Sequence, residues 1–147
     1  MTTKKLLLQA CKDNVEKRIT DYRNEMALLA EAIENNDKES EDGDGGNGKL
    51  LNDIEKNAGY LNEALKTRDF LAQINPNSTH TTAALGSIVK TETIVFYLST
   101  SVGQIEIENE IYYAISLQSP IGMLLKGKSK TDSFTFNDKK YTVVDIL

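Results

Sequence analysis

The chain has 147 residues, of which 39% are hydrophobic and 27% charged. This is the composition of a globular protein, and no run approaches the roughly 18 apolar residues that a membrane-spanning helix needs. The net charge is −5 at neutral pH, and no stretch gathers the lysines and arginines that would neutralise nucleic-acid phosphates. We therefore expect neither a membrane partner nor direct sequence-specific binding to nucleic acid.

The first long segment, from Lys4 to Asn36, contains neither proline nor glycine. Its apolar residues recur in steps of three and four, which is typical of a coiled-coil seam. At about 1.5 Å per residue, this segment would form a helix of roughly 50 Å. The positions of the predicted seam are Leu8, Cys11, Val15, Ile19, Tyr22, Met26, Leu29 and Ile33.

The single cysteine of the chain, Cys11, falls on this apolar face and cannot form an internal disulfide. We interpret it as a small packed hydrophobic residue rather than a reactive thiol. The residues before it lack the run of roughly 7 to 15 apolar residues of an export signal. A reducing, cytoplasmic location is expected.

Residues 37–48 are acidic and rich in glycine, and we expect them to form the tip of a helical hairpin. Residues 34–44 contain six acids and one lysine, which equals the net charge of the whole chain. Each of the four glycines would cost about 1 kcal/mol relative to alanine inside a helix, so a continuous helix is disfavoured. Such a localised acidic segment suits a basic partner surface or a metal ion.

This acidic segment has two other interpretations. A calcium-binding EF-hand loop starting at Asp42 fits poorly, because Asn47 falls where glycine is needed and Asp53 falls where glutamate is needed. The other alternative, which the sequence leaves open, is a solvated turn whose charges only keep the end of the hairpin soluble.

The segment from Lys49 to Asn75 predicts a second helix, which ends where Pro76 forces the preceding residue out of the α region. Two seams of similar length joined by a short glycine-rich loop favour an antiparallel coiled-coil hairpin over residues 1–75. The predicted seam of this second helix consists of Leu51, Ile54, Ala58, Leu61 and Leu65.

Residues 76–85 are polar and are predicted to be a linker, with His80 as a solvated loop residue. From Gly86 the apolar period changes to two, so that residues 86–147 predict a small antiparallel β domain. Ser119, Pro120 and Gly127 mark a short helix within it. The chain is therefore expected to be α+β, with strands at Ser87–Lys90, Thr93–Leu98, Gln104–Ile107, Ile111–Ile115, Ser133–Phe136 and Lys140–Ile146.

The segment Ile115–Lys128, with Asp132 and the closing strand Lys140–Leu147, resembles the C-terminal domain of the Gre (GreA/GreB) family of transcription elongation factors. The shared pattern is a strand ending in Ile-Ser, Ser-Pro before a small helix, Gly-Lys, and a terminal strand that contains tyrosine. The resemblance covers about 60 residues from Gly86 onward. In the family, too, an N-terminal coiled-coil hairpin precedes this domain.

The resemblance implies an FKBP-like fold for the second domain, docked at the rim of the RNA polymerase secondary channel. It implies that the hairpin enters this channel, and that the protein is a monomeric regulator rather than an enzyme. It would at most stimulate the polymerase's own RNA cleavage, sharing the polymerase Mg²⁺ and holding no metal of its own. The candidate docking residues are Ser119, Pro120, Ile121, Met123 and Leu124.

Cleavage-competent members of the family have an Asp-x-x-Glu pair at the tip, where carboxylates help to hold a second Mg²⁺. Here, Asp44 in the place of the aspartate puts Asn47 in the place of the glutamate. Cleavage stimulation is therefore left open by the sequence. The candidate tip acids are Asp42, Asp44, Glu41 and Glu39.

Two alternatives come from other classes of protein. The FKBP-like fold could be taken to indicate peptidyl-prolyl isomerase activity, but fold does not imply function and no tryptophan is present to floor a proline pocket. The second alternative is a structural or protein-interaction coiled coil with no polymerase role, which pairs with another partner or with itself.

Overall fold

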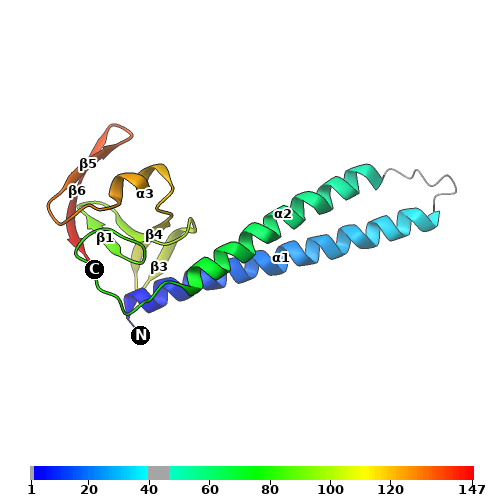
Figure 1. Ribbon diagram of the computed structural model, residues 1–147, viewed down its shortest axis with the longest axis horizontal. Coiled ribbons are helices and arrows are strands. Elements are labelled where there is room, and N and C mark those ends of the chain that lie inside the picture. Colours follow the sequence, from blue (N-terminus) through cyan, green and yellow to red (C-terminus); the bar gives the residue numbers. More distant parts are fainter. Residues whose placement is uncertain (1, 40–46) are drawn as a thin grey trace. The chain divides into compact units, whose positions relative to one another are not determined.

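The structure is a computed structural model that describes residues 2–39 and 47–147, and the side chains of residues 2–36 and 47–147. Within this part of the chain, two long helices are followed by four strands, a short helix and two more strands (Figure 1). The chain forms two compact units. One consists of Asn14–Asp69, and the other combines Met1–Asp13 with Phe70–Leu147. This confirms the predicted α+β class.

The unit Asn14–Asp69 is an antiparallel helical hairpin made by α1 (Thr3–Glu39) and α2 (Asn47–Ala72). Three contacts tie the helices together, and later positions in α1 meet earlier positions in α2, as an antiparallel arrangement requires. They are a hydrogen bond of 3.2 Å between Asn36 and Asn47, a tilted ring contact between Tyr22 and Tyr60 with centroids 5.7 Å apart, and an ion pair of 3.6 Å between Glu16 and Arg68.

The predicted seam of α1 is confirmed, since its positions are buried or half-buried from Leu8 to Ile33. The predicted seam of α2 is wrong at two positions, because Leu51 is 56% exposed and Ala58 is also exposed. Asn57 is half-buried in place of Ala58, and its Nδ2 donates to the backbone oxygen of Asp53 at 2.9 Å.

The second unit is built on a six-stranded sheet with the order β3-β4-β2-β1-β6-β5. Four of the pairings are antiparallel, but β2 and β4 run parallel, which the prediction of an antiparallel sheet missed. After β2 the chain crosses to the edge of the sheet and forms β3. It then turns back as β4, which lies between β3 and β2 and runs parallel to β2. The strands are β1 (Ile88–Thr91), β2 (Val95–Leu98), β3 (Gly103–Ile107), β4 (Glu110–Ile115), β5 (Ser133–Phe136) and β6 (Lys139–Ile146).

Neighbouring residues of a strand point to opposite faces of a sheet. Consecutive residues of β1 and β2 are apolar and buried, so both faces of this sheet are apolar. Val89 and Phe96 pair on one face, in a core that includes Leu125 of the short helix α3 (Pro120–Leu125). Ile88 and Tyr97 pair on the other face. Leu7, Leu8 and Cys11 from the start of α1 are also buried in this unit.

Cys11 is packed as the sequence predicted. Its side chain is fully buried, and Sγ lies 3.5 Å from Ser99 Oγ after β2. Burial raises the pKa of the Cys11 thiol, against smaller opposite effects of hydrogen bonding to Ser99 and Thr100. The thiol form is therefore retained, and Cys11 ties the first part of α1 to the sheet.

Residues 76–85, predicted as a linker, are packed on the sheet unit. Ala83 is buried, its N–H donates to the oxygen of Lys128 at 2.8 Å, and its own oxygen accepts from Gly127 at 2.8 Å. The interpretation of His80 as a merely solvated residue was wrong, because its ring is half-buried and Nδ1 lies 3.1 Å from Lys4 Nζ. Within the described residues, no helix has the length and apolar character to cross a membrane.

Candidate functional site

The tip of the hairpin lies between the end of α1 at Glu39 and the start of α2 at Asn47. The predicted tip acids Glu41, Asp42 and Asp44 lie outside the described residues, as does the side chain of Glu39. The described residues nearest to this segment in the sequence are the end of α1 and the start of α2.

Asn47, which stands where the Gre pattern has glutamate, is the first residue of α2. Its side-chain oxygen accepts a hydrogen bond from Asn36 Nδ2 at 3.2 Å, and both residues are half-buried. A neutral carboxamide can join two helices without the repulsion that a glutamate would feel beside the other acids. In this chain the position therefore helps to close the end of the hairpin.

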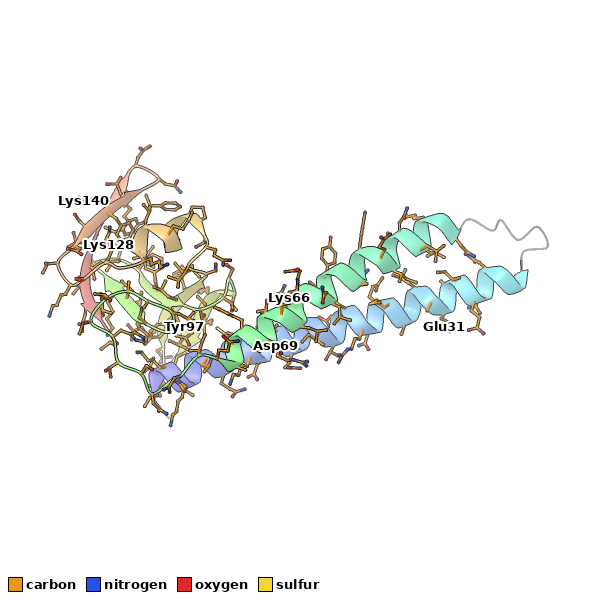
Figure 2. All side chains as sticks on the ribbon, in the orientation of Figure 1. Glu31, Lys66, Asp69, Tyr97, Lys128 and Lys140 are labelled. Atoms are coloured by element: carbon orange, nitrogen blue, oxygen red, sulfur yellow. The ribbon has the colours of Figure 1, made fainter. Side chains whose placement is uncertain are left out.

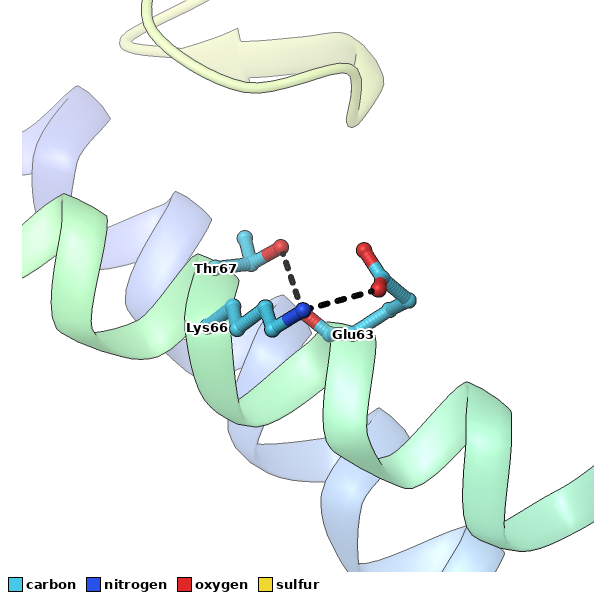
Figure 3. Close-up of polar contacts among 3 residues, drawn as sticks. All are labelled: Glu63, Lys66 and Thr67. Carbon is cyan, nitrogen blue, oxygen red and sulfur yellow. Dashed lines mark hydrogen bonds and ion pairs between the residues drawn. The ribbon is translucent and has the colours of Figure 1, made fainter.

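The flank of the hairpin carries only exposed ion pairs among its described residues. Lys66 Nζ lies 3.5 Å from Glu63 Oε1, and Thr67 Oγ1 donates to the backbone oxygen of Glu63 at 3.0 Å (Figure 3). Exposed pairs of this kind add roughly 0 to 1 kcal/mol each to the free energy of unfolding. They provide solubility more than rigidity.

The second candidate region is α3, whose start is fixed by serine hydroxyls. Ser119 is the N-cap: its Oγ accepts from Gly122 N at 3.1 Å and donates to Ser116 O at 2.6 Å. Pro120 occupies the first helical turn, where its missing N–H leaves no hydrogen bond unmade. The Ser-Pro motif therefore sets where this helix begins and which way it faces.

Gly122 brings α3 close to the preceding segment. A Cβ atom at this position would overlap the backbone oxygen of Ser116 and lie 2.9 Å from Leu117 Cα. Both neighbours are backbone atoms, so the clash could not be relieved by turning a side chain. Glycine is therefore required here for packing, although its φ angle is not in the left-handed region.

The side chains of α3 divide into an inner and an outer set. Leu125 is fully buried, and Ile121 is half-buried and packs against the core beneath α3. Met123 is 62% exposed and Leu124 is 37% exposed, and Pro120 is exposed beside them. Of the predicted docking residues, Pro120, Met123 and Leu124 are thus available at the surface, whereas Ser119 and Ile121 build the helix.

Lysines follow α3 in the chain and begin β6: Lys126, Lys128, Lys130, Lys139 and Lys140. Figure 2 labels Lys128 and Lys140 on the sheet unit, and Lys139 Nζ lies 5.2 Å from the ring centre of Tyr141. Within the described part of the chain, none of these lysines forms an ion pair with a carboxylate.

The described residues contain no group of three His, Cys, Asp or Glu side chains that could hold a metal ion. Residues 40–46 of the acidic segment lie outside the described residues. The prediction that only the polymerase Mg²⁺ is shared therefore stays a prediction.

No family model matches this chain, and no curated protein matches its sequence. Solved structures that resemble it include the transcription factor Gfh1, which is 17% identical, with 93% of each chain covered and a TM-score of 0.38. Another is GreA factor homolog 1 (Gfh1) of Thermus thermophilus, at 16% identity, with 92% of this chain and 94% of that chain covered and a TM-score of 0.36.

Proposed function

We propose that this protein is a transcription elongation regulator of the Gre type that binds RNA polymerase at its secondary channel. The hairpin would enter the channel with the acidic segment 37–48 leading, while the surface of α3 docks at the rim. The protein acts as a regulator and has no catalytic site of its own.

The observation that carries this proposal is an antiparallel hairpin whose two helices end at the acidic segment. α1 ends at Glu39 and α2 begins at Asn47, so in the sequence the acidic segment connects the two helices. Six acids and one lysine in residues 34–44 carry a charge that a polymerase Mg²⁺ or a basic channel wall would attract. The Gre-like pattern from Ile115 to Lys128 supplies the second domain that such a factor needs.

The direct test is binding to a bacterial RNA polymerase, followed by an RNA cleavage assay on a stalled, backtracked complex. We expect binding, and we expect that the double substitution Asp42→Asn and Asp44→Asn weakens whatever effect the protein has on the complex. Absence of binding would overturn the proposal. An effect that survives both substitutions would assign it to other acids of the segment.

The docking surface is tested by the double substitution Met123→Ser and Leu124→Ser. Both side chains point outward, so the fold is retained while the apolar contact is lost, and we expect at least a tenfold weaker polymerase affinity. Val144→Ser is the matched control, because this exposed residue lies on β6 and outside α3. Equal losses in the two variants would exclude α3 as the docking site.

The substitution Asn47→Glu tests whether the lack of a carboxylate at position 47 limits stimulated RNA cleavage. The substitution restores the family's acidic pattern after Asp44 but removes the carboxamide that accepts from Asn36. We expect an increase in stimulated RNA cleavage relative to wild type, because two carboxylates hold Mg²⁺ better than one carboxylate and an amide. Asn52→Glu adds the same charge on an exposed turn of α2 and should not increase cleavage.

A further inference from the structure

A pocket of about 390 Å³ lies in the sheet unit, away from the surface of α3. Its wall is formed by the start of α1, by residues 76–80 and by the ends of β1 and β6. Both chain ends drawn in Figure 1 belong to this unit, in agreement with the residues that line the pocket. The lining includes Thr2, Thr3, Lys4, His80, Ile88 and Ile146.

The most unusual group in this pocket is the ammonium group of Lys4. Only 9% of Lys4 is exposed, and Nζ donates to Ser78 O at 2.7 Å and contacts His80 Nδ1 at 3.1 Å. No carboxylate forms an ion pair with it among the described residues. Lysines buried to this degree are ordinarily paired with an acid, so the positive charge here lacks its usual partner.

His80 is the second basic group in the pocket. Because Nδ1 faces an ammonium donor, the ring accepts at that nitrogen and is neutral. Burial and the charge of Lys4 lower the pKa of His80, while a hydrogen bond to the Leu147 backbone acts in the opposite direction. The groups at the ring are the Lys4 ammonium from α1 and the backbone of Leu147, the last residue of the printed sequence, which also lines the pocket. The Ser78 oxygen contacts Lys4.

The start of α1 adds to the positive potential. Thr2 and Thr3 line the pocket where α1 begins, so the positive end of the helix dipole lies here, although Lys5 N already donates to Thr2 Oγ1 at 3.3 Å and Leu6 N donates to Thr2 O at 3.1 Å. Three separate features thus favour a negative charge at one place: the helix start, a buried ammonium without an acid, and a histidine that can gain a proton. The opposite wall is apolar, with Ile88 and Ile146.

We propose that this pocket binds a small organic anion, whose oxyanion group contacts Lys4 Nζ and whose apolar part lies against Ile88 and Ile146. Binding of the anion is coupled to proton uptake by His80, because a negative charge between the two basic groups removes their mutual repulsion. The anion therefore binds more tightly below neutral pH. This site is independent of polymerase binding.

The chain contains a single histidine, so its imidazole NMR signals report His80 without further assignment. We would titrate these signals against pH in sodium chloride and in sodium pentanoate at equal ionic strength. Saturating pentanoate is expected to raise the pKa of His80 by about one unit, the effect of an opposite charge at close range. Pentanoate should also shift the methyl signals of Ile88 and Ile146, and acetate should bind on the order of tenfold more weakly.

Lys4→Met should abolish the effect of pentanoate on the pKa of His80, whereas Lys5→Met, at the neighbouring exposed lysine, should leave it intact. An unchanged pKa in pentanoate, or a shift that persists in Lys4→Met, would overturn the site. Tighter binding of sulfate than of pentanoate would overturn the assignment of the apolar part. The methyl shifts are measured on the wild-type chain, so the conclusion does not depend on the folding of a variant.

Discussion

The two units of this protein are stabilised in different ways. In the hairpin unit Asn14–Asp69, the fully buried apolar side chains among the described residues are Val15, Ile19 and Ala64. The sheet unit has apolar cores on both faces of its sheet, including Ile88, Tyr97 and Leu125. Two packed helices shield mainly the stripe between them, whereas a sheet packed on both faces buries more side chains. The hairpin unit therefore has few fully buried residues, and the sheet unit has many.

The largest expected difference comes from the same truncation made in each unit. Leu125→Ala opens a cavity under α3, where the side chain is fully buried, and should lower the free energy of unfolding by about 2–5 kcal/mol. Leu61→Ala in α2 removes a half-buried side chain that the surroundings can partly replace with water, and should cost about 1 kcal/mol. Urea unfolding monitored by circular dichroism measures both. Equal costs would contradict the contrast between the units.

Glycine substitutions provide a second contrast, of smaller size. Gly122→Ala places a methyl group against the backbone of Ser116, and should lower the free energy of unfolding by about 1–3 kcal/mol. Gly59→Ala, on an exposed turn of α2 with no atom within 4 Å of the added carbon, should raise it by up to about 1 kcal/mol through helix propensity. Thermal unfolding of the two variants should therefore move in opposite directions.

Much of the fold could be predicted because both units follow simple periodicities. The strand from Ser133 to Phe136 was predicted to the residue, and α3 was predicted from Ser119 and Pro120, whose capping geometry is local. The parallel pairing of β2 with β4 was missed because it depends on which strand lies outside which, and no local signal in the sequence encodes that order.

The candidate sites show the same division between local and distant causes. Met123 and Leu124 could be named from the sequence, but the period of so short a helix did not separate them from the inward-facing Ile121. Lys4 and His80 are 76 residues apart in the sequence, so no local sequence pattern around either residue predicts their contact. The tip acids were predicted from the local charge and from the resemblance to the Gre family, and they stay a prediction.

Acidification should affect the sheet unit through His80. The pKa of His80 is lowered in the folded state, so the unfolded chain binds a proton more readily. The corresponding stability is complete above the ordinary histidine value of about 6.5 and is lost as pH falls toward the lowered value. Urea unfolding should therefore show declining stability below about pH 6.5. His80→Gln should lack this decline, and an identical decline in the variant would assign it to another group.

The smallest effect tests how the hairpin is closed beside the acidic segment. Asn36→Ala removes the donor to Asn47 and should lower the free energy of unfolding by about 1 kcal/mol, with faster amide exchange at the adjoining helix ends. Asn52→Ala is the control, because this exposed residue lies in the same part of α2 and alanine favours the helix. If exchange near Asn47 is unchanged by Asn36→Ala, the carboxamide pair does not hold the helix ends together. The side-chain oxygen of Asn47 would then not be held by Asn36 and could contact another group.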